Sequence, residues 1–314
     1  MAERAVGVGS LIGFLLAALS VTGFAATFVF GGALTRDCDV SPEVLSFLRF
    51  AIAGGVMLAV GSAHAKGRAR LASPTRGDWL TMLWLAPVGT CLMAWCVFMG
   101  CARVSTANAS MADALTPLMI YLVDALVRRR IDFRGLLGLA SGFVGAVLVI
   151  RIVDFGGVAL DAYSTGDVYI LLSAATWGAY TVFGRRLNRK LGSAVFTTWT
   201  MLLGAGMIGL VLPFGDFAWP STPNAWALVV GLGTASTLMP FWAWNAAQRY
   251  LRTSTLAMTA YFTPVVAMGL GLVFLGEGAT ALQWLGTAFI VGSAVVETRG
   301  TDAWTPRRRE QDET

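Results

Sequence analysis

The chain has 314 residues, of which 56% are hydrophobic and only 13% are charged. Soluble domains carry about 25% charged residues, so the composition excludes an ordinary soluble fold and predicts an all-α polytopic membrane protein. The formal net charge of +5 does not indicate a nucleic-acid partner, because the Lys and Arg residues lie in short segments between long apolar stretches.

Ten stretches of the chain are apolar and long enough, at about 20 residues, to cross a lipid bilayer as helices. The first of them is interpreted as a retained span, not a signal peptide, because no small-residue cleavage site follows it. The expected spans cover residues 9–30, 43–62, 79–100, 105–127, 133–153, 167–185, 194–214, 225–248, 254–275 and 282–296.

The distribution of Lys and Arg predicts the orientation of these spans. Cytoplasmic loops of membrane proteins are enriched in Lys and Arg. With a cytoplasmic N-terminus, 19 basic residues fall in cytoplasmic segments, whereas only Arg36 and Arg103 fall in external loops. The pattern therefore predicts ten transmembrane helices with both termini in the cytoplasm.

The two halves of the sequence resemble each other. Pro117 and Pro264 are 147 residues apart, and so are Gly145 and Gly292. Each half has five spans, and because five is odd the second half must enter the membrane from the opposite side. This is an inverted repeat, which is typical of transporters that work by alternating access. We expect one repeat in residues 1–153, an external linker in 154–166, the second repeat in 167–299 and a cytoplasmic tail in 300–314.

Several short motifs resemble the drug/metabolite transporter superfamily, in its ten-span EamA-like group. The resemblance covers about residues 10–298, and the motifs are Pro42-Glu43, Leu48-Arg49-Phe50, Trp177-Gly178-Ala179-Tyr180, Thr263-Pro264-Val265, Leu275-Gly276-Glu277 and Leu285-Gly286. Within the superfamily, Ala243-Trp244-Asn245 and Tyr261-Phe262-Thr263-Pro264 resemble the branch that exports aromatic amino acids. The chain departs from the family pattern at Arg130, where the family has Glu, and around Val21-Thr22, where the family has Trp.

Asp113 is the strongest candidate for a functional residue. It lies about nine residues into the fourth span, and a carboxylate at that depth is costly unless it has a function or a partner. One interpretation is that Asp113 binds a substrate ammonium group or titrates as a coupling site. The other is a structural ion pair between Asp113 and Arg49, which lies at similar depth in the second span.

Aromatic and amide side chains within the spans are the other candidates for substrate binding. They suit an apolar or aromatic solute, which stacking would hold and a few polar groups would orient. Plain packing is the alternative for each of them. The candidate residues are Asn108, Trp177, Tyr180, Trp242, Trp244, Asn245 and Tyr261.

Pro117 and Pro264 each remove a backbone hydrogen bond in a span, so each is either a hinge or a static kink. Glycines in the fifth and tenth spans favour close helix packing, and whether they form a homodimer face stays open. Whether Cys38 and Cys101, both on the expected external side, form a disulfide also stays open.

Together these features predict a secondary transporter, with no cofactor, that exports small metabolites across the inner membrane. The resemblance implies amino acids, aromatic or otherwise apolar, and a drug or other metabolite is the alternative. Proton coupling, exchange and facilitated diffusion all stay open. A membrane-embedded enzyme fits poorly, because the single histidine, His64, lies in a basic loop. A channel also fits poorly, since no filter-like repeat is present.

Overall fold

The computed structural model describes residues 2–104, 109, 113, 115–129, 137, 139–144, 153–154, 157–158, 165–263, 265–266 and 281–300. The first half contains α1 (Ala2–Gly32), α2 (Pro42–Ser62), α3 (Ala65–Leu71), α4 (Arg76–Ala86), α5 (Met93–Cys101) and α7 (Thr116–Arg128). The second half contains α9 (Thr165–Leu191), α10 (Ser193–Gly209), α11 (Pro223–Gly233), α12 (Met239–Ala247), α13 (Thr253–Thr259) and α15 (Ala281–Gly300). A short hairpin of β1 (Val153–Asp154) and β2 (Gly157–Val158) lies between the halves.

Within the described residues, five helical stretches are long and apolar enough to cross a membrane. They cover Gly9–Asp37, Pro42–Ser62, Arg76–Cys101, Ser193–Phe214 and Pro223–Ala247. They match the predicted spans one, two, three, seven and eight within a few residues. The predicted spans six and ten fall in α9 and α15, and spans four, five and nine are described only in part.

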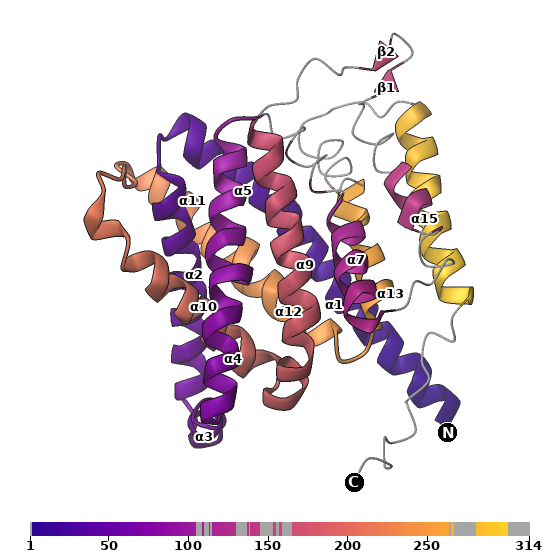
Figure 1. The fold of residues 1–314 in the computed structure, drawn as a ribbon, viewed down its shortest axis with the longest axis horizontal. Coiled ribbons are helices and arrows are strands. Elements are labelled where there is room, and N and C mark those ends of the chain that lie inside the picture. The colour runs from indigo at the N-terminus through magenta and orange to yellow at the C-terminus, as the bar shows by residue number, and fades with distance from the viewer. Residues whose placement is uncertain are drawn as a thin grey trace.

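The helices form one bundle with a large apolar core and a smaller one beside it. The large core joins α1, α2, α5, α9, α10 and α12. The smaller core lies where α7, α13 and α15 meet, and it contains Tyr121, Met258, Tyr261 and Ile290. Figure 1 shows α7, α13 and α15 together on one side of the bundle, with α2, α4, α10 and α11 on the other.

Two π-helical turns interrupt long helices at equivalent places in the two halves. The turn η2 (Pro87–Leu92) lies between α4 and α5, and the turn η4 (Thr234–Leu238) lies between α11 and α12. Their first residues, Pro87 and Thr234, are 147 residues apart, which is the separation between Pro117 and Pro264. A π-turn changes the side-chain register of a helix and often lies at a functional site.

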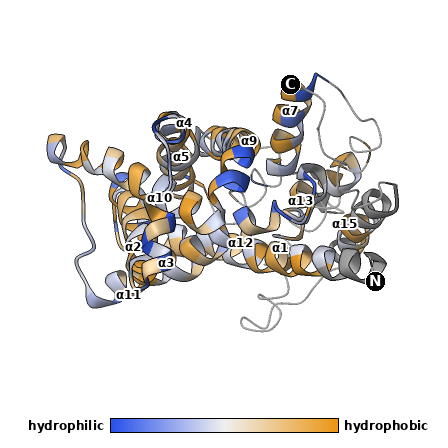
Figure 2. Ribbon diagram, turned by 90° about the horizontal axis from the view of Figure 1, so that it is seen from below, coloured by the Kyte–Doolittle hydropathy of each residue, from blue (hydrophilic) through white to orange (hydrophobic). Residues whose placement is uncertain are grey.

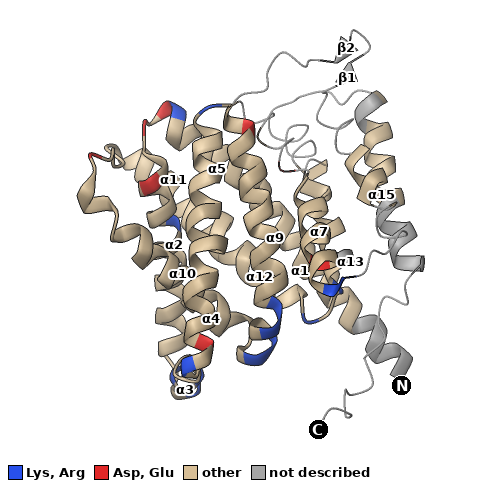
Figure 3. Ribbon diagram, in the orientation of Figure 1, with Lys and Arg blue, Asp and Glu red and all other residues tan. Residues whose placement is uncertain are grey.

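The surface of the bundle is apolar along its sides and charged at its ends. Figure 2 shows hydrophobic residues along the long helices, and large side chains such as Leu15, Val60 and Leu126 are exposed. Lys and Arg residues gather at the end of the bundle that contains α3, as Figure 3 shows, and α1 begins at that same end. At that end the Lys190 Nζ atom contacts both carboxylate oxygens of Asp78, at 2.6 and 2.8 Å. His64 is exposed at the start of α3, as the sequence predicts.

The structure bears on two questions that the sequence left open. Pro117 does not kink a continuous helix, because it lies in the first turn of α7, where a missing N–H costs little. The break comes just before it, at Leu115, so the fourth span is discontinuous in the described residues. Cys38 and Cys101 are both free thiols, so they do not form a disulfide.

Substitution of Gly89 tests whether the π-turn η2 packs tightly against α9. A Cβ atom at Gly89 would overlap the ring of Tyr180, so the Gly89→Ala variant should lose about 1–3 kcal/mol of stability through overpacking. Thermal unfolding in detergent measures the loss. The matched control is Gly55→Ala in α2, where an added Cβ meets nothing within 4 Å. An equal melting temperature for both variants would contradict the packing described here.

Candidate functional site

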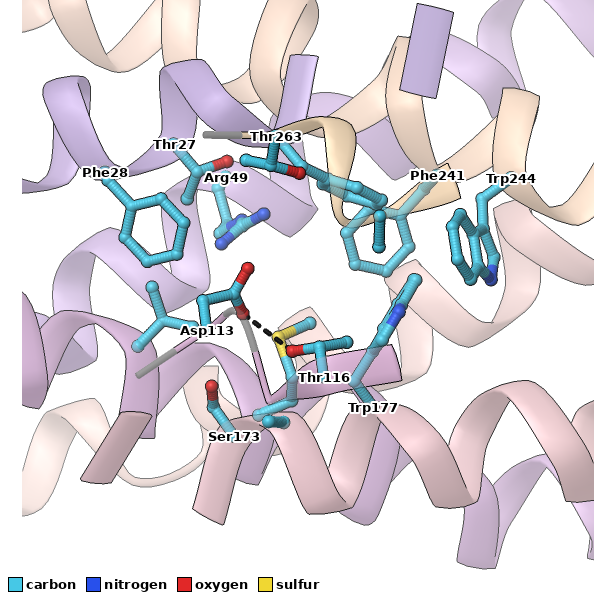
Figure 4. A pocket seen from close by; sticks show the side chains of 15 residues that line it. Thr27, Phe28, Arg49, Asp113, Thr116, Ser173, Trp177, Phe241, Trp244 and Thr263 are labelled. Carbon is cyan, nitrogen blue, oxygen red and sulfur yellow. Dashed lines mark hydrogen bonds between the residues drawn. The ribbon is translucent and has the colours of Figure 1, made fainter. Parts of the chain in front are cut away.

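A cavity of about 60 Å³ lies in the middle of the bundle, between α1, α2, α5, α9 and α12. Residues from the break before α7 and from the segment after α13 also line it. Figure 4 shows two charged side chains on one side of this cavity and a group of aromatic rings on the other. The cavity is therefore amphipathic, and segments from both halves of the chain form it.

Arg49 supplies the positive charge of the cavity. Its side chain is 1% exposed, and its Nε atom donates a hydrogen bond of 3.0 Å to the Thr237 Oγ1 atom in the π-turn η4. The guanidinium carbon lies 5.1 Å from the ring centre of Phe50, 5.3 Å from that of Phe98 and 5.8 Å from that of Phe241. These rings stabilise a desolvated cation by about 2 kcal/mol.

One nitrogen of Arg49 has no hydrogen-bond partner. The Nη1 atom is buried and contacts no acceptor within the described residues. A buried donor of a charged group that stays unpaired costs at least 1–3 kcal/mol, as an order of magnitude. An anionic or carbonyl oxygen in the cavity would remove that cost, so Arg49 is suited to bind such a group.

Asp113 supplies the negative charge and lies on the same side of the cavity as Arg49. Its Oδ1 atom accepts a hydrogen bond of 2.9 Å from the Thr116 Oγ1 atom at the start of α7. The two ion pairs in the described part of the chain are Asp124–Arg128 and Asp78–Lys190, so Arg49 and Asp113 do not form the direct pair considered from the sequence. Both side chains instead line the same cavity, and Figure 4 shows their charged groups directed toward a shared space.

Aromatic rings form the apolar wall of the cavity. Trp177 comes from α9, Phe241 and Trp244 come from α12, and Phe24 comes from α1. The ring centres of Trp177 and Phe241 are 4.8 Å apart, and those of Trp177 and Phe24 are 5.3 Å apart, both in edge-to-face geometry. The Trp244 Nε1 atom donates to the Thr181 Oγ1 atom at 3.2 Å, which fixes its ring. Trp177 and Trp244 therefore line the cavity, and their role in substrate binding stays a prediction.

Tyr180 and Asn245 lie behind this wall, in a buried polar network. The Asn245 Nδ2 atom donates to the Tyr180 Oη atom at 3.2 Å and to the Thr197 Oγ1 atom at 2.9 Å. Its Oδ1 atom accepts from the Gln248 Nε2 atom at 3.2 Å. The Tyr180 ring stacks against Trp177, with ring centres 5.3 Å apart. Neither residue lines the cavity, so their contacts support its wall and do not reach its interior.

The other candidates from the sequence lie elsewhere. Tyr261 is buried in the smaller core, and its hydroxyl donates to the Leu139 carbonyl oxygen at 2.9 Å. Trp242 is 38% exposed on the outer side of α12. Asn108 and Pro264 lie outside the described residues.

Sequence reasoning missed Thr237 and Phe241, which hold the Arg49 guanidinium. Thr237 also donates to the Leu232 carbonyl oxygen, five residues earlier, at 2.6 Å, so one hydroxyl stabilises the π-turn and accepts from Arg49. Threonine and phenylalanine are common in apolar spans, so the sequence alone does not show that these two contact Arg49. The one sequence clue to η4 is the constant separation of 147 residues between equivalent positions of the two halves.

A search against protein-family models matches the chain twice to a single family, over residues 11–151 and 164–298. The chain belongs to the EamA-like transporter family. Its curated relatives include an aromatic amino acid exporter of Ancylobacter novellus, 26% identical over 82% of this chain and 88% of that protein. A pseudopaline exporter of Pseudomonas aeruginosa is 25% identical over 91% of this chain and 96% of that protein. A crystal structure of a protein 26% identical to this chain superposes with a TM-score of 0.72, over 94% of this chain and 99% of that chain.

The Asn245 network predicts a loss of stability. The Asn245→Ala variant removes the Asn245 partner of buried groups of Thr197 and Gln248, and each group left unpaired costs about 1–3 kcal/mol, whereas the Tyr180 hydroxyl keeps its contact with Thr200. We expect a clearly lower melting temperature in detergent. The matched control, Asn224→Ala, removes an exposed asparagine from α11 and should change stability by less than about 0.5 kcal/mol. An Asn245→Ala variant that is as stable as the control would contradict the structural role.

Proposed function

We propose that this protein is a secondary transporter that exports amino acids with aromatic or other apolar side chains across the inner membrane. In this proposal the ten spans form two inverted five-helix repeats, with both termini in the cytoplasm. Two observations support the internal repeat. One family model matches the chain twice, and the first residues of η2 and η4 are 147 residues apart, as are Pro117 and Pro264. The basic end of the bundle supports the orientation.

The observation that favours an amino acid is the pairing of opposite charges beside an aromatic wall. The unpaired Arg49 Nη1 atom suits a carboxylate, and the Asp113 carboxylate suits an ammonium group. Phe241, Trp177 and Trp244 suit the side chain of a substrate. A zwitterion with an apolar side chain satisfies all three features together, whereas a purely cationic or purely apolar drug leaves the Arg49 donor unpaired.

Transport requires the cavity to open, because its present volume is too small. Pockets for small molecules usually measure about 300–1,000 Å³, and this cavity measures about 60 Å³. Arg49 and Asp113 both belong to the first half, and Arg49 is hydrogen-bonded to Thr237 in the π-turn η4 of the second half. Movement of one half against the other would therefore break the Arg49–Thr237 hydrogen bond and free the guanidinium group to turn toward a substrate, as alternating access requires.

Counterflow into proteoliposomes tests the proposed function. Vesicles loaded with unlabelled phenylalanine should accumulate labelled phenylalanine above equilibrium, with saturation, and lysine or glutamate inside should not replace it. Counterflow driven only by another metabolite, such as the pseudopaline exported by the Pseudomonas relative, would favour the alternative substrate class. Ohmic single-channel currents would contradict a transporter.

Arg49 should contribute to substrate affinity through one charge-assisted hydrogen bond. Such a bond is worth about 1.5–3 kcal/mol, so the Arg49→Gln variant should raise the half-saturation concentration for phenylalanine about ten- to hundredfold. The measurement is the concentration dependence of counterflow, with size-exclusion chromatography as the test of folding. The Arg103→Gln variant is the matched control, since Arg103 is exposed at the end of α5. Equal values for the two variants would contradict the role of Arg49.

Asp113 should determine whether transport responds to a proton gradient. The Asp113→Asn variant keeps the shape of the side chain and one acceptor for Thr116, but it removes the charge and the titratable proton. We expect it to fold and to lose net transport of phenylalanine. If the wild-type protein responds to an imposed pH gradient and the variant responds equally, Asp113 is not the coupling site.

A further inference from the structure

A second, larger groove lies at the basic end of the bundle, outside the central cavity. Its volume is about 610 Å³, and it runs between α1, α12 and the junction of α9 with α10. α12 separates the two sites, because it directs Phe241 and Trp244 into the central cavity and Trp242 into this groove. The groove therefore shares no lining residue with the central cavity and is a separate site.

The polar part of the groove is suited to an anion. α10 begins at Ser193 and has 17 residues, and Ser193, Ala194 and Val195 of its first turn line the groove. The start of a helix carries N–H groups without helical partners, so it attracts negative charge. The Ser193 side chain is only 5% exposed, and its Oγ atom has no hydrogen-bond partner within the described residues. A buried hydroxyl without a partner is a donor that a ligand oxygen would satisfy.

Basic side chains surround this helix start. Arg249 and Arg70 both line the groove and are exposed. The Arg249 Nη2 atom lies 3.9 Å from the position that a Cβ atom would take at Gly192, whose φ of +89° and missing side chain leave the helix start open. Lys190 also lines the groove, but Asp78 neutralises its charge. Arg70 and Arg249 thus leave the groove with a positive charge.

The rest of the groove is lined mainly by apolar and aromatic side chains. Ile12 and Leu16 of α1 form one wall. Trp242 and Tyr250 form the other and are 38% and 36% exposed, which is typical of aromatic residues at a membrane interface. A free inorganic anion would leave these walls without a partner.

We propose that this groove binds one anionic phospholipid. Its phosphate accepts hydrogen bonds from the start of α10 and from the Ser193 hydroxyl, and it pairs with Arg249 and Arg70. Its acyl chains lie against Leu16 and Trp242. Basic pockets between transmembrane helices on the cytoplasmic side bind anionic headgroups by this chemistry. The proposal does not depend on the transported substrate.

Native mass spectrometry of the delipidated full chain in detergent tests this proposal. The probes are phosphatidylglycerol and phosphatidylcholine with identical acyl chains, added at equal concentrations. We expect one phosphatidylglycerol to bind more tightly than phosphatidylcholine. A basic residue at a membrane surface contributes about 1 kcal/mol, so Arg249→Gln and Arg70→Gln should each weaken binding about fivefold. The Ser193→Ala variant should weaken it too, without lowering the melting temperature of the lipid-free protein.

The control variant is Arg189→Gln, which removes an exposed arginine from the same end of the bundle but not from the groove. It should bind phosphatidylglycerol as the wild-type protein does. Equal binding of both lipids would overturn the proposal. It would also be overturned if Arg189→Gln weakened phosphatidylglycerol binding as much as Arg249→Gln and Arg70→Gln do. Inorganic phosphate at millimolar concentration should not displace the lipid. If phosphate protects the protein from thermal unfolding as well as phosphatidylglycerol does, the groove is a site for soluble anions.

Discussion

The arrangement of the central cavity depends on the burial of the Arg49 guanidinium. Removing a cation from water costs several kcal/mol even after the protein relaxes around it. The Nε–Thr237 hydrogen bond and the three phenylalanine rings offset part of that cost, but the Nη1 donor has no partner within the described residues. In the proposed function, a carboxylate that enters the cavity supplies the missing acceptor, and the cost of burying Arg49 becomes affinity for a negatively charged substrate group.

This constraint explains why the helices around the cavity are irregular. In a continuous α-helix the Thr237 hydroxyl would be directed elsewhere, because a π-turn shifts the side chains that follow it. In η4 Thr237 accepts from Arg49, while Ser236 and Thr27 hold α1 against the same turn. The break before α7 similarly places Asp113 beside the first turn of that helix. Irregular backbone is tolerated at membrane depth where it lines a polar cavity or is buried in protein. The break before α7 places Asp113 in the cavity wall, and η4 contacts the cavity through the Arg49–Thr237 hydrogen bond.

The sequence predicted the class of protein and most of the described spans, because hydrophobic length and the distribution of Lys and Arg are strong signals. It placed Asp113, Trp177 and Trp244 among the candidate site residues, because charges and large aromatic rings are conspicuous within apolar spans, and it considered Arg49 only as an ion-pair partner of Asp113. It did not separate the cavity wall from the layer behind it. Tyr180 of α9 lies one layer out, as its stacking against the back of Trp177 shows only in the structure. Asn245 also lies one layer out and Trp242 faces outward, because the rotation of α12 depends on the π-turn η4 before it. Helix periodicity alone assumes an unbroken register, and η4 changes that register four residues before Trp242.

The most direct test of this account is the binding of three related compounds to the purified wild-type protein by isothermal titration calorimetry. L-Phenylalanine has both charged groups, phenethylamine lacks the carboxylate, and hydrocinnamate lacks the ammonium group. If Arg49 and Asp113 bind the two ends of a zwitterion, phenylalanine should bind about tenfold or more tightly than either analogue, since each lost charged hydrogen bond costs at least about 1.5 kcal/mol. In the Arg49→Gln variant, phenethylamine should then bind as well as phenylalanine. Equal affinity of the wild-type protein for all three compounds would contradict the account.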